Sequence, residues 1–256
     1  MPPVPEGSAG ATSRAGVNDY DSFAEAYSAE TEANLVNGYY TRPAILDLAG
    51  DVAGRRILDA GCGSGPLIAA LRDRGALVTG IDSSTTMLAL ARRRLGPDAD
   101  LHVADLGDPL PFPDSAFDDV VASLVLHYLE DWAAPLAELR RVLKPGGRLI
   151  AAVDHPFAIS LLHRAQGRTE SYFETYAWTD EWTFGGHPAL MRFWHRPLHA
   201  MTDAFTAAGF RISVISEPPL APDTPRELIP PEIADKPAFL SFIFFVLQAG
   251  CSPLGA

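Results

Sequence analysis

The sequence predicts an α/β fold with a mostly parallel sheet and helices on both faces. Between residues 56 and 153, short runs rich in Val, Ile and Leu alternate with amphipathic segments of helical length. The first of these runs leads directly into three alternating glycines, Gly61, Gly63 and Gly65. In α/β sheets such a turn sits at the carboxyl end of a strand, where ligands bind.

The hydrophobic periodicity, with Gly and Pro residues at the ends of elements, predicts the helices and strands in order. Helical spacing predicts helices over 20–36 and 41–51 before the first strand, 56–60. A helix over 65–74, a strand over 76–81, a helix over 84–95 and a strand over 100–103 come next. After them we expect a strand over 117–123, a helix over 132–143 that stops at 144–147 (Lys-Pro-Gly-Gly), and a strand over 148–153. A helix over 202–208 and strands over 211–216 and 239–248 complete the chain.

The glycine turn departs from the dinucleotide fingerprint. That fingerprint places its third glycine three residues after the second, where this chain has Pro66. The carboxylate of Asp59, two residues before the turn, would repel a pyrophosphate but attract a cationic amino group. The second strand ends near Asp82, which is suited to bind a ribose diol. A ligand with an adenine, a ribose and a positive amino acid tail fits these features.

Five segments carry a family resemblance: LDAGCGSG (58–65), GIDSS (80–84), VADLGDPLPF (103–112), FDDVVASLVLHYLED (117–131) and LKPGGRLI (143–150). In this order the chain resembles the class I S-adenosylmethionine-dependent methyltransferases, in the small-molecule branch that includes quinone-biosynthesis enzymes. The resemblance covers roughly residues 20–210 and the last strand. It implies a Rossmann-like seven-stranded sheet whose last strand lies antiparallel beside the fifth. It also implies S-adenosyl-L-methionine as methyl donor and S-adenosyl-L-homocysteine as product.

The resemblance also implies a set of cofactor-binding residues. Asp59 is expected at the methionine amino group, Asp82 at both ribose hydroxyls, Met87 against the adenine and Asp105 at its amino group. The full expected set is Tyr20, Tyr27, Asp59, Gly61, Cys62, Gly63, Asp82, Ser83, Met87, Ala104, Asp105, Leu106 and Ser123. Each Asp could instead be a helix cap or turn residue. The tyrosines, with Tyr40 as a further candidate to cover the methionine end, could instead be core packing.

We expect a disordered tail over 1–16 and a single methyltransferase domain over 17–256, with an N-terminal helical cover (17–52) and an inserted lid (154–197). The insertion holds nine of the 24 aromatic residues of the chain, so we expect substrate contacts there. The candidates are Tyr172, Trp178, Trp182 and His195. An extra helical pair or a dimer contact is the alternative for this segment. The Pro-rich stretch 217–237 is expected to form a second wall.

Candidate catalytic residues follow the fourth and fifth strands. His127, Asp154 and His155 come where these strands end, and a histidine is suited to accept a proton from a hydroxyl nucleophile. Such a histidine could instead only bind or shape the substrate. We expect O-methylation of a small, fairly apolar molecule in specialised metabolism. The alternatives are a cyclisation or rearrangement with the cofactor bound unreacted, and a binding module without catalysis.

Composition narrows the partners. A formal net charge of −12 disfavours nucleic acid and anionic membrane surfaces. Two cysteines provide neither a disulfide framework nor a metal cluster, so no metal is expected. Because no apolar stretch matches a membrane span or a signal peptide, we expect a cytoplasmic protein. Monomer and homodimer both stay open.

Overall fold

The computed structural model describes residues 16–231, 233 and 240–250. The expected tail, except Gly16, lies outside the described residues, as do parts of the Pro-rich stretch and Cys251. The helices are η1 (Tyr20–Ser22), α1 (Ala24–Thr31), η2 (Asn37–Thr41), α2 (Arg42–Ala49), α3 (Pro66–Asp73), α4 (Thr85–Leu95), η3 (Leu126–Tyr128), α5 (Ala133–Val142), α6 (Pro156–Ala165), α7 (Leu198–Ala207) and η4 (Arg226–Leu228). The strands are β1 (Arg56–Ala60), β2 (Leu77–Asp82), β3 (Leu101–Val103), β4 (Phe117–Ser123), β5 (Leu143–Asp154), β6 (Tyr176–Phe184), β7 (His187–His195), β8 (Phe210–Ser216) and β9 (Phe242–Ala249).

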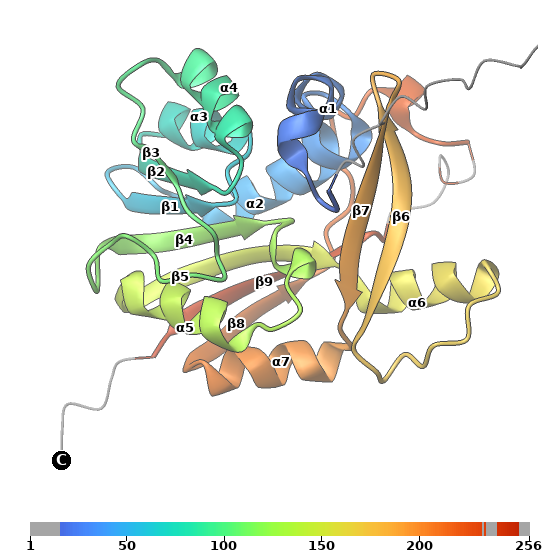
Figure 1. The fold of residues 1–256 in the computed structure, drawn as a ribbon. Helices are drawn as coiled ribbons and strands as arrows, with labels where there is room; N and C mark the ends of the chain where they lie inside the picture. Colours follow the sequence, from blue (N-terminus) through green and yellow to red (C-terminus); the bar gives the residue numbers. More distant parts are fainter. Residues whose placement is uncertain (1–15, 232, 234–239, 251–256) are drawn as a thin grey trace, which may run out of the picture.

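The main sheet has seven strands in the order β3-β2-β1-β4-β5-β9-β8. Strands β1 to β5 pair in parallel, and β9 pairs antiparallel with both β5 and β8. The carboxyl ends of the parallel strands point toward α1 and a separate hairpin of β6 and β7 (Figure 1). The predicted fold class, with its antiparallel last strand, is confirmed.

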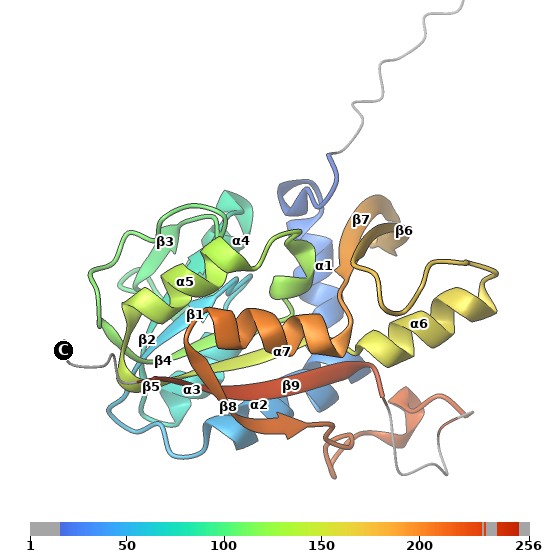
Figure 2. The same cartoon turned by 90° about the horizontal axis from the view of Figure 1, so that it is seen from below.

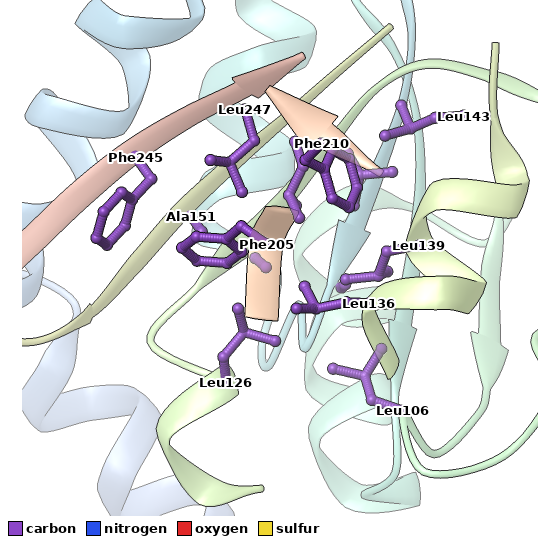
Figure 3. Close-up of a cluster of buried hydrophobic side chains, with 14 of the residues drawn as sticks. Leu106, Leu126, Leu136, Leu139, Leu143, Ala151, Phe205, Phe210, Phe245 and Leu247 are labelled. Carbon is purple, nitrogen blue, oxygen red and sulfur yellow. The ribbon is translucent and has the colours of Figure 1, made fainter. Parts of the chain in front are cut away.

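Successive residues of the central strands enter two different cores, because side chains alternate between the faces of a sheet. Leu58, Val120 and Ala151 belong to a cluster that α5 and α7 cover. Figure 3 shows Ala151 of this cluster together with Leu136 and Leu139 of α5. Their neighbours Ile57 and Val121 belong to a second cluster that α2, α3 and α4 cover. Helices therefore cover both faces of the sheet, and Figure 2 shows α5 and α7 from below. The buried side chains of both clusters hold the ends of the strands in fixed positions.

Two segments differ from the prediction by local geometry. The helix predicted over 20–36 is broken into η1 and α1, and a π-helical turn, η2, leads into α2. The first part, α1, ends at Thr31, and Asn34 lies in the break, where its side chain Oδ1 accepts a hydrogen bond from the backbone N–H of Asn37 at 2.7 Å, as the cap of the helical run that follows does. Strand β5 begins at Leu143 rather than at residue 148, so the Lys-Pro-Gly-Gly stretch belongs to the strand and a bulge opposite 117–119 absorbs it.

The expected insertion over 154–197 contains α6 and the β6–β7 hairpin. The hairpin forms a two-stranded sheet of its own, in which Tyr176 pairs with His195 and Phe184 with His187 across the turn at Gly185 and Gly186. Its strands were not predicted. The hairpin stands beside α1, and α6 extends past its base (Figure 1). The division of the chain into cover, core and lid stays a prediction.

Candidate functional site

A cavity of about 380 Å³ opens at the carboxyl ends of β1, β2 and β4. Every residue expected to bind the cofactor lines it. Residues that sequence reasoning missed also line it, among them Asn18, Thr41, Arg42 and Tyr128. The structure thus brings together residues spread over more than 100 positions, because each lies at or after the carboxyl end of a strand or belongs to the N-terminal cover.

The glycine turn forms the floor of the cavity. Gly61, Gly63 and Gly65 all have positive φ angles, of 78°, 53° and 81°, a backbone region that L side chains rarely adopt. A Cβ on Gly61 would come within 2.7 Å of a methyl carbon of Val125. A Cβ on Gly63 would meet no atom within 4 Å and would occupy open space. The turn therefore lets backbone approach whatever the cavity holds.

Asp82 fixes the wall between β1 and β2. Its Oδ2 accepts from the backbone N–H of Gly63 at 2.8 Å, and its Oδ1 accepts from that of Ser84 at 2.9 Å. Burial raises the pKa of this carboxyl, while the two backbone hydrogen bonds oppose the rise. With one bond on each oxygen, the carboxylate keeps lone pairs for two further donors such as vicinal hydroxyls.

Asp59 is buried at 2% exposure, and its Oδ2 has no hydrogen-bond partner. Desolvation, with the nearby Asp82 carboxylate as a second cause, raises the pKa of Asp59 to about 7. A buried unpaired carboxylate oxygen is costly and calls for a partner. A cationic amino group in the cavity would supply one.

Adenine-binding candidates lie along the next wall of the cavity. Met87 is buried and lines it. Asp105 lines it too, and its Oδ1 accepts from the backbone N–H of Gly107 at 2.7 Å. Leu106 follows as a buried neighbour. Cys62 is also buried, and burial raises the pKa of its thiol, so the neutral thiol packs against the turn.

Three tyrosines roof the other end of the cavity. The hydroxyls of Tyr20 and Tyr128 lie 2.6 Å apart, and the rings of Tyr20 and Tyr27 meet edge to face at 5.1 Å. Burial raises the pKa of all three hydroxyls. They are therefore neutral at physiological pH and present no negative charge to a ligand. Sequence reasoning predicted Tyr20 and Tyr27 but missed Tyr128, although its place in the short helix that follows β4 could have suggested it.

Asp21 ties this roof to the body of the protein. Its Oδ1 accepts hydrogen bonds from the Ser84 hydroxyl and the Thr86 backbone N–H, at the first turn of α4. These bonds hold the pKa of the carboxyl below its usual value. Tyr40, the further cover candidate, is fully buried instead, with its ring stacked on Phe242 at 5.9 Å. The expectation that it covers the methionine end is wrong.

Thr41 and Arg42 form a basic corner of the cavity at the end of the π-helical turn. The Oγ1 of Thr41 is buried and unpartnered, and π-helical turns often mark functional sites. Arg42 donates to the backbone carbonyl of Glu32 at 3.1 Å. The carboxylate of Glu32 is bonded to Arg94, so the remaining guanidinium donors of Arg42 are available to a ligand. A hydroxyl and a guanidinium together suit a carboxylate.

His155 does not line the cavity. It is the N-cap of α6, where its Nδ1 accepts from the backbone N–H of Ala158 at 3.4 Å. Its Nε2 lies 2.7 Å from Oε1 of Glu217. Both ring nitrogens are engaged, so the structure does not support His155 as a base. A side chain one residue beyond a strand can turn either way, and here it turns into the start of a helix.

His127 and Asp154 lie close together, behind Tyr128. The Nδ1 of His127 accepts from the backbone N–H of Asp154 at 3.2 Å and lies 3.4 Å from its Oδ1. Burial lowers the pKa of the histidine and raises that of the carboxyl. With His195 they line a second void of about 10 Å³, which has room for about one water molecule.

The expected substrate contacts all belong to the hairpin region and not to the wall of the large cavity. Trp178 stacks on Phe193 at 4.7 Å, and Trp182 meets the same ring at 5.3 Å. Tyr172 contacts His195 edge to face at 5.7 Å. Phe193 in turn stacks on Tyr128 at 5.2 Å, which joins the hairpin to the cavity roof.

The fold is Rossmann-like, and the cavity suits an adenosyl amino acid. Comparison with known proteins agrees: residues 58–151 match a family described as a methyltransferase domain. A demethylmenaquinone methyltransferase from Tropheryma whipplei (strain Twist) is 34% identical over 142 residues, which cover 54% of this chain and 58% of that protein. A malonyl-[acyl-carrier protein] O-methyltransferase from Serratia marcescens is 40% identical over 108 residues, 41% of each chain. The chain thus spans about half the length of the curated relatives it matches.

A solved structure extends the likeness beyond the matched half. The S-adenosylmethionine-dependent methyltransferase from Mesorhizobium loti superposes with a TM-score of 0.59 at 26% identity, over 80% of this chain and 96% of that one. Residues 58–151 thus match the methyltransferase-domain family, and the chain is similar in sequence to quinone-biosynthesis methyltransferases and in structure to an S-adenosylmethionine-dependent methyltransferase. In the part of the chain described, no helix is long and apolar enough to cross a membrane.

Proposed function

We propose that this protein transfers the methyl group of S-adenosylmethionine to a hydroxyl oxygen of a small, fairly apolar molecule. The observation that carries the proposal is the buried, unpartnered carboxylate oxygen of Asp59 beside the glycine turn. That arrangement suits the ammonium of an amino acid tail, and the acceptor lone pairs that Asp82 keeps beside its two backbone hydrogen bonds suit a ribose diol. We assign the remaining cofactor-binding residues the roles expected of them from the family resemblance.

The basic corner completes recognition of the tail. Asp59 would hold the ammonium, and Thr41 and Arg42 would hold the carboxylate, so opposite charges meet at both groups. The three tyrosines would then cover the tail and exclude water. Holding donor and acceptor aligned can lower the barrier by roughly 7–11 kcal/mol in favourable cases. The names of two relatives state two different methyl acceptors. The residues that would bind the cofactor therefore support the reaction class, and other residues must determine which acceptor binds.

Product mass tests the reaction class. Incubation of the purified protein with S-adenosylmethionine and a panel of phenols, enols and carboxylic acids should give products about 14 daltons heavier, with S-adenosylhomocysteine released in equal amount. A product of unchanged mass whose formation requires the cofactor would instead support the cyclisation or rearrangement. Cofactor binding without any turnover across the panel would favour a binding module.

Arg42→Met is expected to weaken binding of S-adenosylhomocysteine by about 10- to 100-fold, because a hydrogen-bonded charge contributes roughly 1.5–3 kcal/mol. Binding of 5′-methylthioadenosine, which lacks the amino acid tail, should stay unchanged. Isothermal titration calorimetry of both ligands measures the difference. Arg93→Met, which removes an exposed guanidinium on α4, is the matched control. Equal losses for the two ligands would show that Arg42 only supports the cover.

A further inference from the structure

The first helices of the N-terminal cover lie between α4 on one side and the hairpin of β6 and β7 on the other (Figure 1). The polar side chains of Asp21, Glu25, Ser28 and Glu32 recur every three or four residues, which is the spacing of one helix face. All four make hydrogen bonds to α4, to its N-cap or to the glycine turn. Three of the four are acidic, and the last turn of α4 is basic. The cover therefore meets α4 through opposite charges.

Arg94 makes the most extensive of these contacts. Its Nε donates to the backbone carbonyl of Ser64 in the glycine turn at 2.9 Å, and its Nη1 donates to Oε1 of Glu32 at 2.9 Å. Its Nη2 donates to Oε2 of the same carboxylate. Such a bidentate pair uses the planar fork of the guanidinium. Both oxygens of Glu32 thus accept from Arg94, and these hydrogen bonds hold the pKa of the carboxyl below its usual value.

The same glutamate lies beside a second guanidinium, that of Arg42. The Nη2 of Arg42 donates to the backbone carbonyl of Glu32 at 3.1 Å. After the bonds from Arg94, the charge of Arg42 is a further cause of the lowered pKa of Glu32, so the two side chains attract each other. Arg42 lines the cofactor cavity, whereas neither Glu32 nor Arg94 is among the described residues that line it. A carboxylate outside the cavity is therefore placed to compete with a ligand inside it for Arg42.

Arg94 opposes this competition by its charge. Burial is the main cause of a lowered pKa at Arg42, and of its two charged neighbours Glu32 raises that pKa while Arg94 lowers it. The pair of Glu32 and Arg94 thus attracts Arg42 less than Glu32 alone would. A guanidinium bound to Glu32 would have to be released before it could bind a ligand, so only its unbound fraction would be competent.

We propose that Arg94 is a positioning residue for the amino acid tail of the cofactor: it neutralises Glu32 and so leaves the guanidinium of Arg42 free to bind the carboxylate of the tail. The inference rests on the proposed function, in which Arg42 binds that carboxylate. It adds a residue outside the cavity that sets the affinity for the tail. Removal of Arg94 is then harmful only while Glu32 is present.

A double-mutant cycle on the full chain tests the proposal by calorimetric titration with S-adenosylhomocysteine and 5′-methylthioadenosine. Arg94→Met should weaken binding of S-adenosylhomocysteine about three- to tenfold, because Glu32 then holds Arg42 for most of the time. Glu32→Gln should leave that affinity within about twofold of the parent protein. Arg94→Met combined with Glu32→Gln should restore the affinity to the same margin, because the competing carboxylate is gone. Binding of 5′-methylthioadenosine, which lacks the tail, should stay unchanged in all three variants and shows that each is folded.

The pair of Arg93 and Glu25 is the matched control. It also joins α4 to the cover, at 2.9 Å, but both of its side chains are exposed, and Arg93→Met should leave both affinities unchanged. Equal losses in Arg94→Met, Glu32→Gln and the double variant would mean that the pair of Arg94 and Glu32 only anchors the cover. Parallel losses for both ligands would mean that Arg94 acts through Ser64 and the glycine turn. Either result, or an unchanged affinity in Arg94→Met, overturns the proposal.

The parent protein separates this proposal from the one on which it rests. Failure of the parent protein to bind S-adenosylhomocysteine in the same titrations would count against the proposed function. Binding by the parent protein together with a loss in Arg94→Met that Glu32→Gln does not reverse would count against the positioning role alone.

Discussion

Asp82→Ala is expected to weaken S-adenosylhomocysteine binding by at least about 100-fold. Two hydrogen bonds from ribose hydroxyls to a charged acceptor contribute roughly 1.5–3 kcal/mol each. The carboxylate also fixes the glycine turn through the backbone N–H of Gly63. Binding of 5′-methylthioadenosine should fall in parallel, because it carries the same ribose. Calorimetric titration of both ligands measures the loss.

A second carboxylate provides the control for Asp82. Asp100 accepts from the Thr79 hydroxyl and lies against His102, outside the cavity. Asp100→Ala should therefore leave both affinities within about twofold of the parent protein, even if it lowers stability. If Asp82→Ala also kept its affinities within that margin, the ribose would bind elsewhere and the assignment of the cavity would fail.

Asp59→Asn is expected to change stability and binding in opposite directions. The amide removes a buried carboxylate that lacks a partner, so the protein without ligand should melt about 2–4 °C higher at pH 8, the shift for roughly 1 kcal/mol in a chain of this size. Binding of S-adenosylhomocysteine should fall at least about tenfold, because its ammonium loses the charge that faces it. Thermal melting with and without ligand measures both effects.

The pH dependence of Asp59 follows from its raised pKa of about 7. Between the pKa of the unfolded chain, near 4, and 7, the folded protein holds more protons, so this group lowers stability as pH rises through that window. Ligand ammonium favours the charged form, so the gain in melting temperature from S-adenosylhomocysteine should grow between pH 6 and pH 8. The difference between parent and Asn profiles isolates Asp59 from other groups. Asp98→Asn, at an exposed site, should reproduce the parent profile; a flat difference would contradict the assignment.

The cofactor half could be predicted because its signals are local. The glycine turn, the acid that ends β2 and the apolar strands each lie within a few residues, and topology brings the strand ends together. Every expected cofactor residue accordingly lines one cavity. Their individual roles stay predictions, to be tested by the variants above.

The part of the site that would bind the methyl acceptor depends on packing between residues far apart in the sequence, and no local sequence pattern predicts such packing. The alternation of Tyr176, Trp178, Trp182 and Phe184 before Gly185-Gly186 is a hairpin signal, which the density of aromatic residues alone does not reveal. The direction of the Tyr40 side chain depends on the π-helical turn that contains it, and that of His155 depends on the helix that it caps. Arg42 became a candidate only because the fold places it in the lining of the cofactor cavity.

The antiparallel strand β9 has a consequence for how the chain folds. It inserts between β5 and β8, so that Arg148 pairs with Gln248 across 100 positions of sequence. All residues that line the cofactor cavity lie before position 130, so the ribosome releases them long before β9. Until β9 arrives, the apolar edge of β5 is an open template for pairing with other chains. Such long-range pairing slows folding, and nascent protein is therefore most prone to aggregate after its cofactor site has been synthesised and before its sheet is closed.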